Sequence, residues 1–384
     1  MPISKGRLIP AAILAILVYG MIAAMLGTLL PELSKRFSLT PEQNSRLALL
    51  QALGLSIASI SAGPLIDNKG KKTGLVLGLA IITLSLFALP QVTGYATIMA
   101  CWLALGLGGG IIVTAANALV SDIGEEKRSS VLNLLNLFFG LGLMATPFIA
   151  ANLLAGDPIK TCYLVAVLSA VTLVLHIATA MPPPSGERGF KVSEMGELLS
   201  RAALYLLAFQ LFLYVACEVG FTTWLAIHLT AQGMAERDAL NVLAGFAFGI
   251  LIGRVVVSRI LIKIPAATVT LAAAVLMTAT TYMTLQTADV MVARVVVFCA
   301  GLAMAPVFPT TLGMTGDAFP KATATAMGIV ITAGWIGLVV SAPIIGGIAG
   351  DDPKRLQTAL LVFPAASVIM ILVNLALRPM LRKA

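Results

Sequence analysis

Twelve long apolar runs fill most of this chain, and they limit its possible folds more than any other feature. They cover residues 9–30, 45–66, 73–90, 95–120, 129–154, 160–181, 202–230, 239–262, 265–286, 290–315, 322–349 and 356–378. A helix needs about 20 apolar residues to cross the hydrocarbon core of a bilayer. It also satisfies its own backbone hydrogen bonds, which lipid cannot do. The runs therefore predict an all-α membrane protein with twelve transmembrane helices.

The composition excludes a soluble globular protein. The mean hydropathy is +0.99 and 11% of the 384 residues are charged, whereas soluble domains are about 25% charged. The net charge of +8 comes from short basic clusters between the apolar runs, which indicate topology and not a nucleic-acid partner. Lysine and arginine are concentrated in the loops that are cytoplasmic if both termini are inside. We therefore expect a monomeric, multi-pass protein of the cell inner membrane with both termini cytoplasmic.

No pattern of catalytic or metal-binding residues is present. The four cysteines fall inside apolar runs, without paired or metal-ligand spacing, at Cys101, Cys162, Cys217 and Cys299. No nucleophile with a base and no phosphate-binding loop stands out. We expect neither an enzyme nor a metal site, and no cofactor other than a coupling ion, H+ or Na+.

The two halves of the sequence repeat. The stretches GLGGGIIVTAANALVSDI and GLAMAPVFPTTLGMTGDA align at an offset of 195, which pairs Asp122 with Asp317. In the second and eighth runs the small-residue faces align at an offset of 191, which pairs Gly54 with Gly245. Small residues allow helices to approach closely.

Six helices repeated in the same orientation predict two six-helix bundles, with a solute path between them near the middle of the membrane. We place the N-terminal bundle at residues 1–181 and the C-terminal bundle at residues 202–384. A cytoplasmic linker, residues 182–201, joins them.

One carboxylate lies deep inside an apolar run. Glu218 is 16 residues from the start of the run 202–230 and 12 residues from its end, so it lies near the middle of the bilayer. An ionisable group at that depth is costly unless it faces a partner or a water-filled cavity. Gln210, Tyr214, Glu218 and Thr222 follow one another at four-residue spacing, which predicts a polar stripe that faces a cavity.

Proline and glycine interrupt two runs of the second half. Pro306 and Pro309 fall within the run 290–315, and Gly334 and Gly337 fall within the run 322–349. Such residues are expected to bend a helix or to expose its backbone to a cavity.

The sequence GPLIDNKGKK closes the second run and carries a family resemblance. Its glycine, aspartate, glycine and basic residues resemble the loop signature of the major facilitator superfamily, at Gly63, Asp67, Gly70, Lys71 and Lys72. The resemblance implies a twelve-helix transporter in which this loop helps to hold the inner side closed. Physically, a carboxylate stabilises a neighbouring helix N-terminus, while lysines stay among anionic headgroups.

Three further charged residues complete the predicted inner gate. Asp122 and Asp317 lie at the inner ends of the fourth and tenth runs. Arg254 lies within the eighth run, and the repeat brings it close enough to pair with Asp317. A simpler interpretation is that Arg254 extends toward the membrane surface.

Shorter segments are similar to one branch of that superfamily, the fucose, glucose and galactose symporters. They are GLGGGIIVTAANALV, NLLNLFFGLG, YVACEVGFTTWL and FPT. Fucose-type members carry acidic residues in the first helix and just before TAAN, where this chain has LVYGMIAAMLG and Val113. Glu218 resembles instead an acid in the seventh helix of other branch members, which leaves it as the coupling candidate.

Amide and aromatic side chains are the candidate substrate contacts. Amides donate and accept hydrogen bonds, which suits hydroxyl-rich solutes, and flat rings offer surfaces for a sugar. The predicted substrate-binding residues are Asn117, Asn136, Gln210, Tyr214, Thr222, Trp224 and Trp335. For each residue, interhelical bonding or packing is an equally simple explanation.

These patterns predict a secondary transporter that works by alternating access. Its expected activity is symport of a small hydrophilic solute, a monosaccharide or polyol, with H+ or Na+. A drug or metabolite exporter of the same fold is the first alternative, and GLGLMATPF is a broken version of the exporter motif. A membrane sensor or scaffold without transport activity is the second alternative.

Overall fold

The computed structural model describes residues 5–124, 127–154, 157–182, 192–287, 289–349 and 353–381, and within these ranges it contains helices and no strand. In the first half the helices are α1 (Lys5–Phe37), α2 (Pro41–Lys69), α3 (Lys71–Ala88), the 3-10 turn η1 (Leu89–Gln91), α4 (Tyr95–Gly124), α5 (Arg128–Asn152) and α6 (Pro158–Ala178). They are followed by α7 (Val192–Ser200), α8 (Ala202–Ala231), α9 (Glu236–Ile260), α10 (Ala266–Gln286), α11 (Val290–Met304), α12 (Val307–Ala318), α13 (Thr323–Ala349), α14 (Pro353–Leu360) and α15 (Val362–Leu381).

The described residues contain twelve helical segments long and apolar enough to cross a membrane, which confirms the twelve predicted runs. α11 and α12 together form one span, and the interruption at Ala305 and Pro306 is the break expected from the prolines. α14 and α15 also share one span, a break that the sequence analysis did not anticipate.

Part of the predicted linker is helical. α7 occupies residues 192–200, and residues 183–191 lie outside the described part of the chain. The assignment of residues 182–201 as a linker stays a prediction.

Polar side chains define several helix starts. Thr40 and Gln43 form a reciprocal capping box at the start of α2. Asp157 accepts hydrogen bonds from the backbone N–H groups of Ile159 and Lys160 at the start of α6, at 2.9 and 3.0 Å. The backbone bonds oppose protonation of Asp157, so its pKa lies below the usual range. Each cap satisfies N–H groups that have no partner within the helix.

The described chain divides into two compact units. Unit 1 contains Met1–Glu125, Leu135–Leu198 and Phe319–Thr332, and unit 2 contains Glu126–Leu134, Leu199–Ala318 and Ala333–Ala384. α5 and α13 therefore each contribute to both units. The predicted boundaries at residues 181 and 202 stay a prediction.

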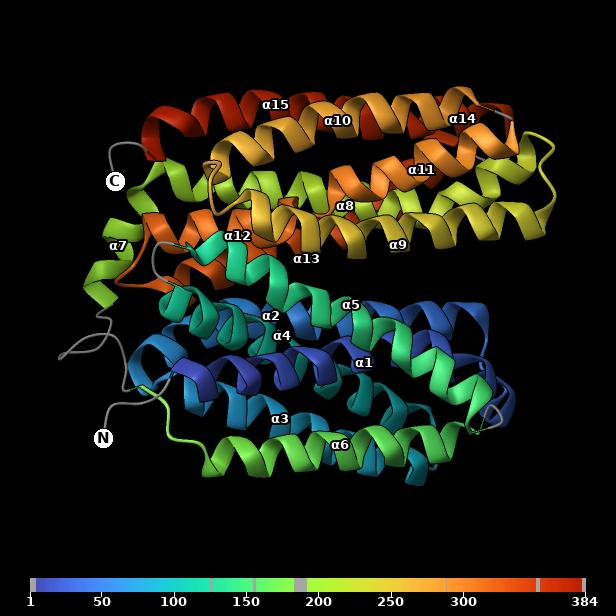
Figure 1. Cartoon of the computed structure of the whole chain (residues 1–384). Coiled ribbons are helices and arrows are strands. Elements are labelled where there is room, and N and C mark those ends of the chain that lie inside the picture. The colour runs from blue at the N-terminus through green and yellow to red at the C-terminus, as the bar shows by residue number, and fades with distance from the viewer. Residues whose placement is uncertain are drawn as a thin grey trace. The chain divides into compact units, whose positions relative to one another are not determined.

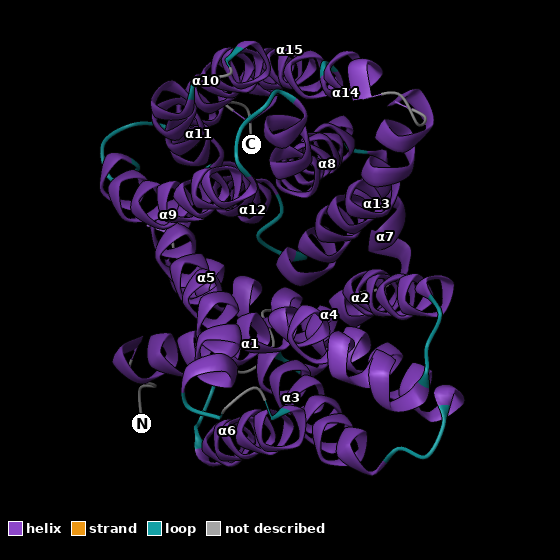
Figure 2. Cartoon of the chain, turned by 90° about the vertical axis from the view of Figure 1, so that its right-hand side faces the viewer, coloured by secondary structure: helices purple, strands orange, loops and turns teal. Residues whose placement is uncertain are grey.

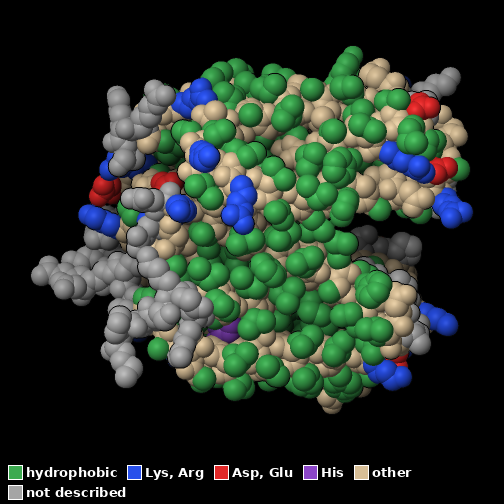
Figure 3. All heavy atoms as spheres, viewed as in Figure 1, with side chains coloured by type: hydrophobic (Ala, Val, Ile, Leu, Met, Phe, Trp, Pro, Cys, Tyr) green, Lys and Arg blue, Asp and Glu red, His purple; other side chains and the backbone are tan. Residues whose placement is uncertain are grey.

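Within unit 1, α4 packs against α1, α2 and α3, and α6 packs against α1 and α3. Figure 2, which looks along the helices, shows α3 beside α6 in this unit. Within unit 2, α9 packs on α11, and α15 packs on α8 and α10. Hydrophobic side chains cover the middle of the helices on the face shown in Figure 3, with lysine and arginine mostly toward the helix ends. Large apolar residues such as Leu84, Phe148 and Met291 are exposed, as expected for lipid-facing surfaces.

The crossing of α2 and α4 depends on glycine. A Cβ atom at Gly106 would overlap the carbonyl oxygen of Gln51, and one at Gly54 would lie 2.6 Å from the carbonyl oxygen of Leu103. The two backbones therefore meet without intervening side chains, the close approach expected of small residues.

The same crossing recurs between α9 and α11. A Cβ atom at Gly301 would overlap the carbonyl oxygen of Phe246, and one at Gly249 would overlap that of Phe298. All four positions lie 195 residues after their counterparts in α2 and α4. Gly142 and Gly337 also meet equivalent carbonyls, those of Leu17 and Phe212, at the same offset.

The predicted offset of 191 for the second and eighth runs is therefore wrong. It paired Gly54 with Gly245, but nothing lies within 4 Å of a Cβ atom at Gly245, whereas Gly249 makes the close contact. Small residues recur every four positions on this face, so the sequence alone matched equally well one helical turn away. A single offset of 195 relates the helix crossings of the two halves.

Gly249→Ala is expected to lower the stability of the protein by about 1–3 kcal/mol, because the added methyl group forces the two backbones apart. Gly245→Ala, on the same helix, is the matched control and should be neutral or slightly stabilising. Unfolding of the purified protein in detergent measures both. Equal stability of the two variants would show that the α9–α11 contact is not tightly packed.

Candidate functional site

Asp67 caps the N-terminus of α13. Its Oδ1 accepts a hydrogen bond from the backbone N–H of Ala324 at 3.2 Å. Its Oδ2 accepts from the N–H and the hydroxyl of Thr325 at 2.8 and 2.7 Å. Asp67 is buried, and all three residues belong to unit 1. The carboxylate thus satisfies N–H groups that the helix leaves open and faces the positive end of its dipole.

Gly63 brings α2 close to the same helix end. A Cβ atom at Gly63 would lie 2.6 Å from the Cα atom of Thr325 and 2.8 Å from the carbonyl oxygen of Ala324. One turn along α13, the carbonyl of Ser59 meets Gly328 in the same way. Any larger side chain at Gly63 would separate α2 from α13.

The other signature residues fasten helices within unit 1. Gly70 turns the chain between α2 and α3 with φ 91°, a conformation that favours glycine. The buried Lys71 forms an ion pair with Asp122 on α4, with 2.6 Å between Nζ and Oδ2. Lys72 donates to the carbonyl of Ile177 at the end of α6 at 2.7 Å.

In unit 2, Asp317 has a different partner from the one suggested by the repeat. Arg128, the first residue of α5, donates to its Oδ1 at 2.9 Å and to the carbonyl oxygen of Gly316 at 3.1 Å. The suggested Arg254–Asp317 pair is therefore wrong. Sequence analysis missed Arg128 because its role follows from the position of α5, which no local pattern reveals.

Two predicted substrate amides are bonded to each other in unit 1. Asn136 on α5 donates to Asn117 Oδ1 on α4 at 3.0 Å, and Asn117 donates to the carbonyl of Val113 at 2.7 Å. Both side chains are buried. In this arrangement the pair joins α4 to α5, the interhelical alternative left open by the sequence.

The polar stripe on α8 is buried at one end and partly exposed at the other. Gln210 donates from Nε2 to the hydroxyl of Thr311 on α12 at 2.9 Å, and its Oε1 has no partner among the described residues. Gln210 and Tyr214 are fully buried, whereas Glu218 and Thr222 are partly exposed. The Glu218 and Thr222 end of the stripe is therefore the end that is open to its surroundings in this structure, and the cavity-facing role of the whole stripe stays a prediction.

Arg254 on α9 is the electrostatic partner of this stripe. It acts on both Glu218 and Tyr214, and it is itself almost fully buried. The Tyr214 hydroxyl has no hydrogen-bond partner among the described residues. A partly exposed acid thus lies within range of a buried cation, which reduces the cost of ionisation at this depth.

Three other predicted contacts surround the stripe less closely. The Thr222 hydroxyl donates to the backbone carbonyls of Glu218 and Val219, each at 3.0 Å. Trp224 is partly exposed, and its ring lies near Gly346 of α13, while the indole N–H has no partner among the described residues. Trp335 is partly exposed on α13. Within the described ranges, no group of three or more His, Cys, Asp or Glu residues is placed to hold a metal ion.

Comparison with known proteins identifies the family. The model of the Major Facilitator Superfamily matches residues 12–342. The chain belongs to the major facilitator superfamily. The fold of this superfamily is also found in the fucose:proton symporter FucP of E. coli, with a TM-score of 0.84, 18% identity, and coverage of 97% of this chain and 99% of that chain.

Relatives within the superfamily include sugar transporters. The glucose/galactose transporter of Brucella abortus is 28% identical over 270 residues. The match spans 65% of this chain and 65% of the relative's length. The human organic anion transporter MFSD10 shares the fold, with a TM-score of 0.80, 15% identity, and coverage of 97% of this chain and 100% of that chain.

Proposed function

We propose that this major facilitator superfamily member is a symporter that moves a small hydrophilic solute, a monosaccharide or polyol, together with H+ or Na+. The observation that carries the proposal is the α8 stripe, in which Glu218 lies near the middle of a membrane-spanning helix, within range of the charge of the buried Arg254. The names of the Brucella relative and of FucP support a sugar as the solute. We place the protein in the inner membrane, as a monomer with both termini cytoplasmic.

The proposed coupling follows from the Glu218–Arg254 pair. With Glu218 ionised, its attraction to Arg254 holds α8 to α9. Protonation or Na+ binding at the carboxylate weakens that attraction, so the local packing depends on whether the coupling ion is present. For Na+, Glu218 and the Thr222 oxygen offer the oxygen ligands that hard cations prefer. A ligand shifts a conformational equilibrium only by such differences in interaction between states.

The Asp67 cap supplies the proposed gate. The cap residues Ala324 and Thr325 lie at the start of α13, whereas Gly337, later in the same helix, meets the Phe212 carbonyl of α8. Movement of α13 away from α2 would break the cap. We infer that the Asp67 contact favours the state in which the inner side is closed.

Uptake into proteoliposomes tests the function. Labelled monosaccharides and polyols are offered with an imposed proton gradient, with an imposed sodium gradient and without a gradient. We expect accumulation of at least one sugar or polyol under one of the two gradients. Transport restricted to apolar drugs, in exchange for protons, would replace the proposal with the exporter alternative. Absence of transport of every compound by the folded protein would favour the sensor alternative.

The Oε1 atom of Gln210 has no partner among the described residues, which leaves it able to accept a hydrogen bond from a substrate hydroxyl. Gln210→Ala removes this acceptor and is expected to weaken substrate binding by about 1–3 kcal/mol. Gln91→Ala, at an exposed amide in η1, is the matched control and should bind as the wild type does. Asn136→Ala should weaken binding by a similar amount if the Asn117–Asn136 pair contacts substrate. Substrate titration monitored by intrinsic fluorescence measures all three. Wild-type affinity in Gln210→Ala and Asn136→Ala would assign these amides to helix packing.

A further inference from the structure

A cavity lies in unit 2, lined by none of the residues of the α8 stripe. It has a volume of about 340 Å³ and is located in unit 2, where α10 begins and α12 and α15 end. None of the residues proposed for coupling or substrate binding lines it. Its lining includes Ala267, Thr268, Asp317, Ala318, Arg378 and Leu381.

The cavity lining contains both a cation, Arg378, and an anion, Asp317. Arg378 donates to the Thr268 hydroxyl at 3.1 Å, which uses one of its five N–H donors. The adjacent start of α10 has no side-chain cap, so its first N–H groups also favour an anion. Asp317, which also lines the cavity, uses Oδ1 for Arg128. A ligand that matches both charged residues carries an anion and a hydrogen-bonding cation.

The surroundings of the cavity favour a lipid over a soluble ion. Ala318, Met314 and Leu381 contribute apolar surface to the lining. The neighbouring turn after α9 exposes Ile262 and Ile264, and α15 exposes Met380. Exposed apolar side chains next to charged groups are typical of the boundary between hydrocarbon and headgroups.

We propose that this cavity binds the headgroup of a phospholipid with a primary ammonium group, such as phosphatidylethanolamine. The phosphate lies toward Arg378 and the start of α10, and the ammonium donates to Asp317. Phosphatidylcholine lacks an N–H donor for Asp317, and phosphatidylglycerol lacks a cation. The site therefore distinguishes the three headgroups through two opposite charges.

Native mass spectrometry of the purified full-length protein tests this site, with titration of the three lipids carrying identical acyl chains. Phosphatidylethanolamine should be retained most strongly. Arg378→Gln should reduce its apparent affinity about tenfold, the loss expected for a charge-assisted hydrogen bond. Arg378→Lys should retain part of it. Ala267→Leu, which fills the cavity without changing charge, should also weaken binding.

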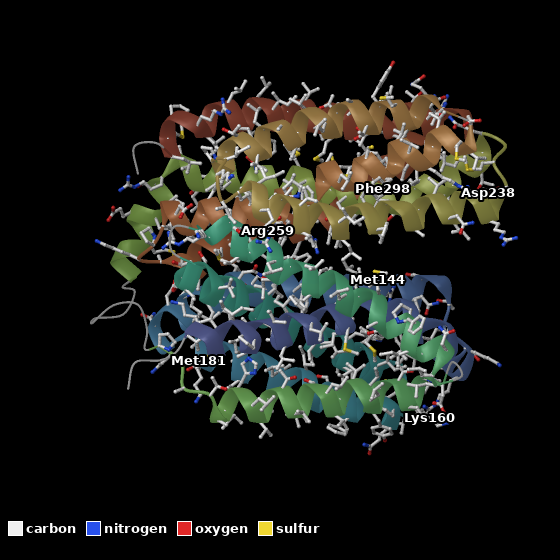
Figure 4. All side chains as sticks on the ribbon, in the orientation of Figure 1. Met144, Lys160, Met181, Asp238, Arg259 and Phe298 are labelled. Carbon is white, nitrogen blue, oxygen red and sulfur yellow. The ribbon has the colours of Figure 1, made fainter. Side chains whose placement is uncertain are left out.

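Two controls separate the site from general surface charge. Arg259 lies near the end of α9 and does not line the cavity; Figure 4 labels it together with Asp238, near the other end of this helix. Arg259→Gln should therefore bind the lipid as the wild type does. Arg128→Gln breaks the ion pair with Asp317 but keeps both cavity charges, and should not weaken binding. A photoreactive phosphatidylethanolamine should crosslink to residues 265–268 or 378–381.

Each of three results would overturn the proposal. They are equal retention of the three lipids, unchanged binding in Arg378→Gln and Ala267→Leu, and crosslinking only to other segments. Displacement of the lipid by millimolar inorganic phosphate, with equal stabilisation of the protein, would assign the cavity to free phosphate and would also overturn it.

Discussion

Glu218→Gln is expected to exchange substrate across the membrane while losing gradient-driven accumulation. Glutamine keeps the shape and much of the hydrogen bonding of glutamate, so the substrate path should stay intact. It cannot release a proton, and it gives a bound Na+ no negative charge. The attraction between Glu218 and Arg254 would then no longer change during the cycle. With the conformational change uncoupled from the ion, downhill exchange remains and uphill transport fails.

Proteoliposomes separate the two activities. Counterflow of labelled substrate measures exchange, and uptake against a concentration difference under a proton or sodium gradient measures coupling. Glu42→Gln provides the matched control, because this carboxylate is 74% exposed at the start of α2 and pairs only with Arg46 among the described residues. It should accumulate substrate normally. Wild-type accumulation by Glu218→Gln would remove Glu218 from the coupling role.

Asp67→Asn is expected to shift the protein toward the state that is open to the inside. The substitution removes the negative charge at the start of α13 and allows the side chain only one acceptor oxygen for the N–H groups of Ala324 and Thr325. Loss of such a charged cap costs about 1–2 kcal/mol. That loss changes the ratio of two conformations about 5- to 30-fold.

Accessibility of a single cysteine reports this shift. Ser59 is fully buried, and its carbonyl meets Gly328 of α13, so Ser59→Cys in a cysteine-free background should react with a membrane-impermeant maleimide only when α13 moves away. Asp67→Asn should accelerate labelling from the inside, and Gly63→Leu should do so by steric separation. Asp157→Asn is the matched control, since it removes another aspartate cap, at the start of α6. Equal labelling rates in all variants would contradict the gate.

The sequence predicted the spans and the family because these depend on local composition and short motifs. Twelve apolar runs are visible without any knowledge of packing, and the break at Pro306 follows from proline chemistry. The Asp67 motif indicated that a helix N-terminus lies nearby. It did not reveal that the helix is α13, which follows 257 residues later.

The partners of buried charges were less predictable. The suggested pairing of Arg254 with Asp317 was wrong and Arg128 was missed. A guanidinium reaches whichever carboxylate the fold brings near, and distances across helices are not encoded in local spacing. The predicted alignment of α9 with α2, at an offset of 191, was wrong for a related reason. Its glycines recur every helical turn, and only contact with the Phe298 carbonyl selects Gly249 over Gly245. The substrate-binding roles of Asn117, Asn136, Gln210 and Trp224 stay predictions.

The constant spacing of 195 residues between equivalent glycine contacts has an evolutionary consequence. For example, it relates the Gly142–Leu17 contact of α5 with α1 to the Gly337–Phe212 contact of α13 with α8. An insertion or deletion in one half, between any two of these positions, would have given the contacts before it and the contacts after it different offsets. The chain therefore has the form of a tandem gene duplication whose two copies have diverged by substitution, with net length preserved between these contacts. Each glycine at such a crossing has its own paralogue within the same polypeptide.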